Sequence, residues 1–290
     1  DDRVLEYPWK PSLHGHPPAQ MANYPCCFNH GGQPCSFDRL LPQLEHGEFD
    51  YVLFGDCEGD LDLPEIKTLA AANPATPWFL IDQTDEPDNA QSAIEERLPN
   101  RRFTAYFKRE MLSCASYPPN TFPLPFAYPA DRLPKIDFDR SRNIDLFWAG
   151  HRRAGLRRPC LELLETHLNK QFDATYTPQA YSAALLNARI GLNLAGFGFD
   201  TVRYWELPAH GALLLSERLP ILIPHDFTDG KTALFFEDPS ELLDKLAYCR
   251  KHPDHTRKLA QAGHAHFLSH HTGPARARQL LGWIADITRP

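Results

Sequence analysis

Short apolar runs alternate with amphipathic segments along most of this chain. Seven runs have the continuous hydrophobicity of strands buried in a parallel sheet: residues 51–54, 78–81, 103–107, 144–149, 190–194, 212–215 and 233–236. Segments with helical spacing, or with a proline in the first turn, predict helices over residues 64–72, 89–98, 156–170, 178–188, 202–209, 239–250, 253–269 and 274–287. This alternation of strands and helices predicts βαβ units and parallel sheets.

Two such series are separated by a proline-rich connector. The chain has 27 prolines, and six of them lie in residues 118–134, which we expect to be extended. Residues 1–48 are rich in Pro, His, Gly and Cys without a clear period, and they predict loops and short helical turns. The pattern as a whole predicts an α/β protein with two Rossmann-like, doubly wound parallel-sheet domains that face a cleft.

The expected boundaries follow from these series. We place an N-terminal domain at residues 1–135, a C-terminal domain at 143–274, and a last helix at 275–290 that crosses back to the N-terminal domain. The chain starts at Asp1 without a methionine. We therefore expect it to be part of a longer polypeptide, with the N-terminal domain truncated at its start.

Composition narrows the class of protein. The 30 Lys and Arg against 37 Asp and Glu give a net charge of −7, which argues against a nucleic-acid binder. No apolar stretch approaches the ~20 residues of a transmembrane helix, and no secretion leader is visible. The seven cysteines do not suggest a disulfide framework, so we expect a cytoplasmic protein.

The first candidate site follows the strand over residues 144–149, because ligands of parallel α/β folds bind at the carboxyl ends of strands. There the chain has a glycine and then four arginines that precede or open a helix: Gly150, Arg152, Arg153, Arg157 and Arg158. A helix N-terminus disfavours positive side chains but binds phosphate, so this segment predicts an anion site. The alternative is a solvated basic turn. The glycine patterns of dinucleotide and Walker-type sites are absent.

The second candidate is the glycine-rich loop that opens the helix over residues 202–209. Asp200 or Thr201 is expected to cap this helix. Arg203 and Glu206 lie three residues apart on one face. In a nucleotide site the cation would meet phosphate, and the carboxylate would accept hydrogen bonds from ribose. A surface ion pair is the alternative. Tyr176 or Phe199 would flank a nucleobase.

With these two candidate sites, the second half of the chain resembles the C-terminal domain of GT-B glycosyltransferases. The resemblance is to the "glycosyl transferases group 1" type found in spore-maturation-like bacterial proteins, and it covers about residues 143–285. The residues that carry it are Arg203, Trp205, Glu206, Ala209, Gly211, Leu213–Leu215, Phe227, Gly230, Phe235, the helix start at 238–242, Ala260, Ala262, Gly263, His271, Thr272 and Arg276.

The resemblance implies a glycosyltransferase without a cofactor or metal, which moves a sugar from a UDP- or GDP-sugar to a hydroxyl of a glycan, a protein or another compound. Glu206 would bind the ribose of the donor, while Arg203 and some of the earlier arginines would meet its diphosphate. Many related enzymes have another glutamate eight residues before this one. This chain has Gly198 there, so Asp200 is our substitute for the contact with the sugar.

The N-terminal half would hold the acceptor and any general base. The candidates are the carboxylates that follow the first two strands: Asp56, Glu58, Asp60, Asp82 and Asp85. An inverting mechanism needs such a base, whereas a retaining one does not require it. The cysteines and histidine at 26–35, and the pair His266 and His270, do not complete a metal-ligand set, so we expect no metal.

Two other functions remain open. One is transfer of a polyol phosphate from a CDP-activated donor, which also uses GT-B scaffolds and would release CMP. The other is a GT-B-like binding or assembly domain without catalytic activity.

Overall fold

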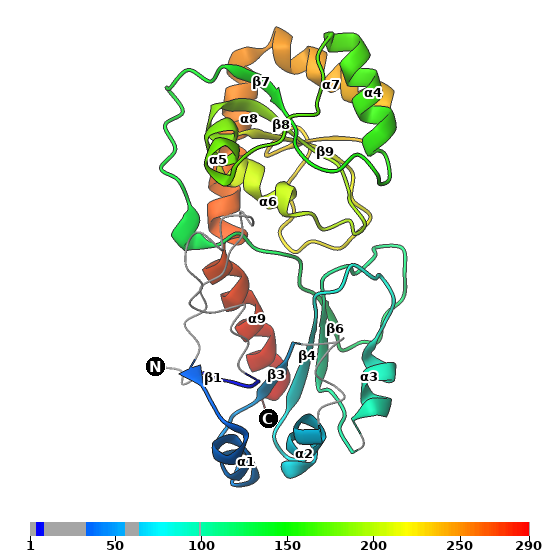
Figure 1. Cartoon of the computed structure of the whole chain (residues 1–290), viewed down its shortest axis with the longest axis vertical. Helices are drawn as coiled ribbons and strands as arrows, with labels where there is room; N and C mark the ends of the chain where they lie inside the picture. The colour runs from blue at the N-terminus through cyan, green and yellow to red at the C-terminus, as the bar shows by residue number, and fades with distance from the viewer. Residues whose placement is uncertain (1–3, 9–32, 56–63, 99, 290) are drawn as a thin grey trace. The chain divides into compact units, whose positions relative to one another are not determined.

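The computed structural model describes residues 4–8, 33–55, 64–98 and 100–289. The chain divides into two compact units between Leu124 and Pro125. Each unit contains a four-stranded sheet in which all strands are parallel, with helices packed against it (Figure 1). The predicted α/β class with two Rossmann-like domains is therefore confirmed.

The sheet of the first unit has the strand order β3-β4-β5-β6. Its strands are β3 (Val52–Phe54), β4 (Trp78–Asp82), β5 (Ala105–Lys108) and β6 (Thr121–Pro123). The helices are α1 (Phe37–Glu45), α2 (Pro64–Ala72) and α3 (Gln91–Arg97). Two further strands of two residues each, β1 (Leu5–Glu6) and β2 (Gln33–Pro34), pair in parallel.

Alternate side chains of β4 point to opposite faces of this sheet, as the period of a strand requires. Trp78 and Leu80 belong to the core cluster that includes residues of α1, α2 and α3. Phe79 points to the other face, where its ring lies 6.0 Å from that of Phe107 on β5. The ring of Phe107 lies in turn 5.7 Å from that of Phe122 on β6.

One helix of the first unit differs from the sequence prediction of loops and short helical turns in residues 1–48. Residues 37–45 form the helix α1 although Pro42 lies inside it, where a proline costs a hydrogen bond. Burial of Leu44 against the rest of the core stabilises this helix, and the local sequence does not reveal that contact. The proline-rich connector contains β6, which pairs only with β5, so Pro123 lies on an edge strand where a proline is tolerated.

The sheet of the second unit has the order β10-β9-β8-β7. Its strands are β7 (Ile144–Phe147), β8 (Ala188–Asn193), β9 (Leu213–Glu217) and β10 (Leu234–Phe236). The helices are α4 (Arg157–Leu168), α5 (Pro178–Asn187), α6 (Val202–Ala209), α7 (Pro239–Lys251), α8 (Pro253–His270) and α9 (Gly273–Thr288). A single 3₁₀ turn, Ala130–Arg132, precedes them.

Helices cover both faces of this sheet. Residues of α4 and α7 pack with one set of strand side chains, including Leu146 and Leu192. Residues of α5 and α6 pack with the opposite set, including Phe147 and Leu214. On β8, Gly191 allows α6 to approach closely, because a Cβ there would lie 2.0 Å from Leu207 Cδ2. This contact fixes α6 against the sheet.

Proline and glycine mark the helix boundaries as the sequence predicts. Prolines occupy the first turns of α5, α7, α8 and α9. Gly211 follows the end of α6 with a φ of +69°, a conformation that favours glycine. Within the described ranges, no helix combines the length and the apolar character that a membrane crossing requires.

Candidate functional site

The candidate site lies in the second unit, where β7 and β8 end and α6 begins. Thr201 stands at the N-cap position of α6, but no side chain caps the helix. The Thr201 hydroxyl instead donates to Asn193 Oδ1 at the end of β8, at 2.6 Å. The prediction that Asp200 or Thr201 caps α6 is therefore wrong. Among the described residues, no side chain accepts from the first N–H groups of α6, as at a helix terminus that binds an anion.

Arg203, in the first turn of α6, reaches back to the end of β7. One of its terminal nitrogens donates to the carbonyl oxygen of Ala149, and its guanidinium lies over the indole ring of Trp148. Gly150 makes this possible, since a Cβ there would lie 2.6 Å from Arg203 Nη2. Its Nε and Nη1 are buried without a hydrogen-bond partner in the described part of the chain.

Glu206 lies one turn further along α6 and is almost fully buried. Its Oε2 accepts a hydrogen bond of 2.7 Å from the hydroxyl of Tyr181 on α5, while Oε1 has no partner among the described residues. Burial raises the pKa of Glu206, and the Tyr181 hydroxyl and the charge of Arg203 oppose that rise. A buried carboxylate oxygen with no donor is costly, so it marks a place where a ligand can supply one.

Arg157, at the start of α4, is the third charged side chain of the site. Its guanidinium donates to the carbonyl oxygens of His151 and Leu194, and its Nε has no partner in the described ranges. Burial, and then the charge of Arg203, lower the pKa of Arg157 to about 10, while Glu217 raises it. Arg203 thus lies within electrostatic reach of both Arg157 and Glu206.

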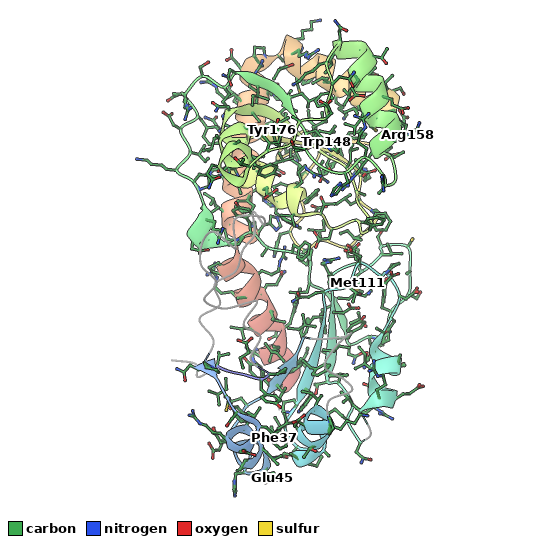
Figure 2. All side chains as sticks on the ribbon, viewed as in Figure 1. Phe37, Glu45, Met111, Trp148, Arg158 and Tyr176 are labelled. Atoms are coloured by element: carbon green, nitrogen blue, oxygen red, sulfur yellow. The ribbon has the colours of Figure 1, made fainter. Side chains whose placement is uncertain are left out.

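The other arginines of the predicted cluster lie elsewhere on α4 and the turn before it. Arg152 makes two hydrogen bonds to Glu165, at 2.6 and 2.8 Å. Arg158 pairs with Glu162 on the exposed side of α4, where Figure 2 labels it. Arg153 is exposed. These three arginines and Glu162 line an open depression of about 500 Å³. The structure thus separates the cluster into one buried and three outer side chains.

Asp200 is tied to two other parts of the second unit by hydrogen bonds. It accepts hydrogen bonds from Trp205 Nε1 at 2.8 Å and from the backbone N–H of Phe126 at 2.6 Å. These bonds join the loop before α6 to the segment that enters the unit. They give Asp200 a structural task, and its contact with a donor sugar stays an untested prediction.

His271 and Arg276, the last histidine and arginine among the residues that carry the family resemblance, extend this structural network. His271 Nε2 lies 2.9 Å from the carbonyl oxygen of His225, and Arg276 Nη2 lies 3.2 Å from His271 Nδ1. The His271 ring therefore donates through Nε2 and accepts through Nδ1. The guanidinium of Arg276 also lies over the ring of Trp205. The motif thus fixes α6 from the side away from Arg203.

Aromatic side chains surround the site unequally. The Tyr176 ring lies 6.2 Å from that of Tyr181 and remains 37% exposed (Figure 2). Phe199 is half-buried. Phe197, between Gly196 and Gly198, is 90% exposed. Tyr176, one of the two predicted nucleobase contacts, is thus linked to Glu206 through Tyr181.

The predicted catalytic carboxylates belong to the first unit. Asp56, Glu58 and Asp60 fall outside the described residues. Asp82 is buried and accepts hydrogen bonds from Thr84, Tyr106 and Lys108. Burial raises the pKa of Asp82, but the bonds from Thr84 and Tyr106 outweigh it, so the pKa lies below its usual value. A carboxylate held in this way is poorly suited to accept a proton from a substrate.

Other site residues were not singled out by the sequence. Tyr181 orients Glu206, while Asn193 and Ser216 link β8 to β9 through a 3.0 Å hydrogen bond. Glu217, which ends β9, accepts from the backbone N–H of Ala195. Asn193, Ser216 and Glu217 share one signal, a position at the carboxyl end of a strand, where polar residues in an apolar run stand out. Tyr181 lies on α5 and has no such signal. Among the described residues, no group of three or more His, Cys, Asp or Glu side chains is placed to hold a metal ion.

Comparisons with known proteins agree with this fold. Three similar solved structures are a glycosyltransferase from Rickettsia africae, HepE from Anabaena with UDP-glucose, and a TarM mutant from S. aureus with fondaparinux, α-GlcNAc-glycerol and UDP. Their identities to this chain are 9%, 10% and 11%, and their TM-scores are 0.57, 0.55 and 0.56. The alignments cover 90%, 86% and 87% of this chain, and 86%, 82% and 59% of the respective structures.

No curated protein matches the sequence significantly. The sequence model of the family described as "Glycosyl transferase-like" matches residues 135–282, which include the whole sheet of the second unit and the site on it. The chain therefore belongs to the glycosyl transferase-like family and has the GT-B type of fold.

Proposed function

We propose that this protein transfers a sugar from a UDP- or GDP-sugar to a hydroxyl of a glycan or protein acceptor. One observation carries the proposal: buried polar atoms of Arg157, Arg203 and Glu206 have no partner among the described residues, beside the uncapped N-terminus of α6. A diphosphate would accept from the two arginines, and a ribose would donate to the glutamate. A single nucleotide therefore supplies both kinds of missing partner.

The proposed reaction uses these charges on the leaving group. The acceptor hydroxyl loses its proton to solvent, and its oxygen bonds to C1 of the sugar as the bond from C1 to the terminal phosphate oxygen breaks. The nucleoside diphosphate leaves with the electron pair of that bond and therefore with an additional negative charge. Arg203 and Arg157 would donate to that charge, and the positive end of α6 would add to their effect. Because these groups already carry positive charge, we propose that the reaction needs no divalent metal.

The nucleoside would extend from Glu206 toward the exposed ring of Tyr176. Tyr181 contacts both residues, through a hydrogen bond to Glu206 and through ring packing with Tyr176. The complexes of HepE with UDP-glucose and of TarM with UDP support a uridine nucleotide. The free cysteines buried in the unit, Cys160 and Cys249, support the proposal of a reducing, cytoplasmic location.

Calorimetric titration with UDP and GDP tests the donor site. We expect one of them to bind the wild type and Arg203→Ala to weaken that binding at least about tenfold, the effect of a charge-assisted hydrogen bond. Arg257→Ala is the matched control, since Arg257 is a half-exposed arginine on α8. If neither nucleotide binds the wild type, the proposed site is wrong.

Turnover tests the reaction itself. Hydrolysis or transfer from the matching nucleotide sugar should release a nucleoside diphosphate, and EDTA should leave the rate unchanged. Release of CMP from a CDP-activated polyol would instead identify a polyol-phosphate transferase. Nucleotide binding without release of any product from either donor class would favour a binding or assembly domain.

A further inference from the structure

The hydrogen bond between Tyr181 and Glu206 joins two helices that pack on the same face of the sheet. Tyr181 lies in the first half of α5, and Glu206 lies in the middle of α6. The Tyr181 ring is held by an edge contact with Phe147 of β7, with ring centroids 5.6 Å apart. Its hydroxyl is therefore presented to Glu206 by a side chain that is itself fixed by the core.

This bond determines which way the Glu206 carboxylate faces. Oε2 accepts from Tyr181 at 2.7 Å, so rotation of the carboxylate would break the bond. Oε1 is left as a buried acceptor without a described partner. Arg203 stands one turn earlier on α6 and its charge reaches this carboxylate, so the free oxygen belongs to the same group of buried polar atoms as the unpaired nitrogens of Arg203.

The same bond favours the ionised form of Glu206. The charged and titratable groups that face this carboxylate are Tyr181 from α5 and Arg203 from α6. Burial favours the neutral form of the acid, whereas the Tyr181 hydroxyl and the charge of Arg203 favour the ionised form. Loss of the hydroxyl would remove one of the two groups that keep the carboxylate charged.

We propose that Tyr181 is a positioning residue that holds Glu206 so that its free oxygen accepts from ribose hydroxyls, and that the pair makes the site select ribonucleotide over deoxyribonucleotide donors. The inference rests on the proposed nucleotide site and adds a determinant of specificity to it. A site built to bond a hydroxyl rejects an analogue that lacks it, because the buried acceptor is then left unpaired.

The test compares Tyr181→Phe with the wild type in calorimetric titrations. The probes are UDP or GDP, whichever binds, and the 2′-deoxy and 3′-deoxy forms of that nucleotide. We expect the wild type to prefer the ribonucleotide over at least one deoxy form by about tenfold or more. Tyr181→Phe should reduce that preference to about threefold or less by weakening ribonucleotide binding, and Glu206→Gln should do the same.

The control variant is Tyr248→Phe, which removes a hydroxyl from a tyrosine on α7 that is 42% exposed. It should keep the preference of the wild type. Far-ultraviolet circular dichroism and the thermal midpoint show whether each variant is folded. Glu206→Gln, which keeps the side-chain size and can still accept from Tyr181, provides a second reading if Tyr181→Phe is unstable.

A pH series separates positioning from a general structural effect. In Tyr181→Phe the pKa of Glu206 rises further, so binding of the ribonucleotide should begin to weaken at a higher pH than in the wild type. Tyr248→Phe should not move this acid limb. If a folded Tyr181→Phe protein discriminates as the wild type does and its binding weakens at the same acidic pH, the inference about Tyr181 is wrong but the proposed site stands. If the wild type binds no nucleotide, the proposed site is wrong as well.

Discussion

The guanidinium of Arg203 lies over the indole of Trp148, with Cζ 5.7 Å from the ring centroid. This contact joins the first turn of α6 to the residue that follows β7. It leaves Nε and Nη1 of Arg203 without partners in the described part of the protein. The most direct predictions concern the residues that permit this arrangement.

Gly150→Ala should displace Arg203 and weaken nucleotide binding while the fold is kept. A Cβ at residue 150 would lie 2.6 Å from Arg203 Nη2, and its φ of +154° disfavours a side chain. We expect about a tenfold loss of affinity, comparable to that of Arg203→Ala. Gly282→Ala is the control, because among the described residues its new Cβ would meet no atom within 4 Å beyond its chain neighbours and the backbone of its own helix. Calorimetry should show unchanged affinity for the control.

Gly191→Ala should destabilise the second unit by about 1–3 kcal/mol, the usual cost of overpacking. Its Cβ would meet the side chain of Leu207, which is fully buried between α6 and β8. Leu207→Ala alone should cost about 2–5 kcal/mol through the cavity it leaves. In the double variant the new methyl partly fills that cavity, so urea unfolding should give a loss smaller than the sum. Strict additivity would show that the two sites do not touch.

His271 should make the protein sensitive to acid. Burial and then the charge of Arg276 lower the pKa of His271 from the 6.5 of an ordinary histidine to about 2. The unfolded chain therefore binds a proton below about pH 6.5 that the folded protein excludes, so stability falls as pH is lowered from there.

His271→Asn should reduce this acid sensitivity. Its side-chain oxygen can still accept from Arg276, and it carries no titrating group. Between pH 6 and 4, the loss of unfolding free energy should be shallower than in the wild type by roughly 1.4 kcal/mol per pH unit. His255→Asn, at an exposed position on α8, should keep the slope of the wild type. Equal slopes for both variants would assign the effect to other groups.

Asp82→Asn should lower the unfolding free energy of the first unit, because it leaves the buried Lys108 without its charged partner. The ammonium group of Lys108 is completely buried and lies 3.0 Å from Asp82 Oδ2. Removal of one partner of such a pair typically costs about 3–5 kcal/mol. The double variant Asp82→Asn, Lys108→Met should recover part of this stability. A stable Asp82→Asn protein without turnover would instead favour a catalytic role for the carboxylate.

Several predictions from the sequence depend only on neighbours along the chain, and these agree with the structure. The helix over residues 64–72 has the predicted bounds, because Pro64 starts it and apolar spacing extends it. Helix α6 also has its predicted bounds, ended by Gly211. Helix α1 was missed because Leu44 stabilises it through contacts that the local pattern does not contain.

In the candidate site, too, features that depend on neighbours along the chain could be predicted, and features that depend on distant contacts could not. Arg203 and Glu206 could be recognised because their spacing places them on one face of a helix. The separation of Arg157 from Arg152 could not be recognised in the same way. It depends on the bonds of Arg152 to Glu165, 13 residues further along the chain, and on the bond of Arg157 to Leu194 after β8. The role of Asp200 was also hidden, since its partner Phe126 is 74 residues distant.

Local sequence patterns specify most of the strands and helices other than α1, many of their ends at proline and glycine, and the face of α6 that carries the site. Those properties follow from backbone conformation and hydrophobic periodicity over a few residues. Tertiary packing is required to bring Tyr181 to Glu206, Arg203 to Gly150 and Lys108 to Asp82. Each of these pairs joins different elements, so its geometry follows from how strands and helices pack.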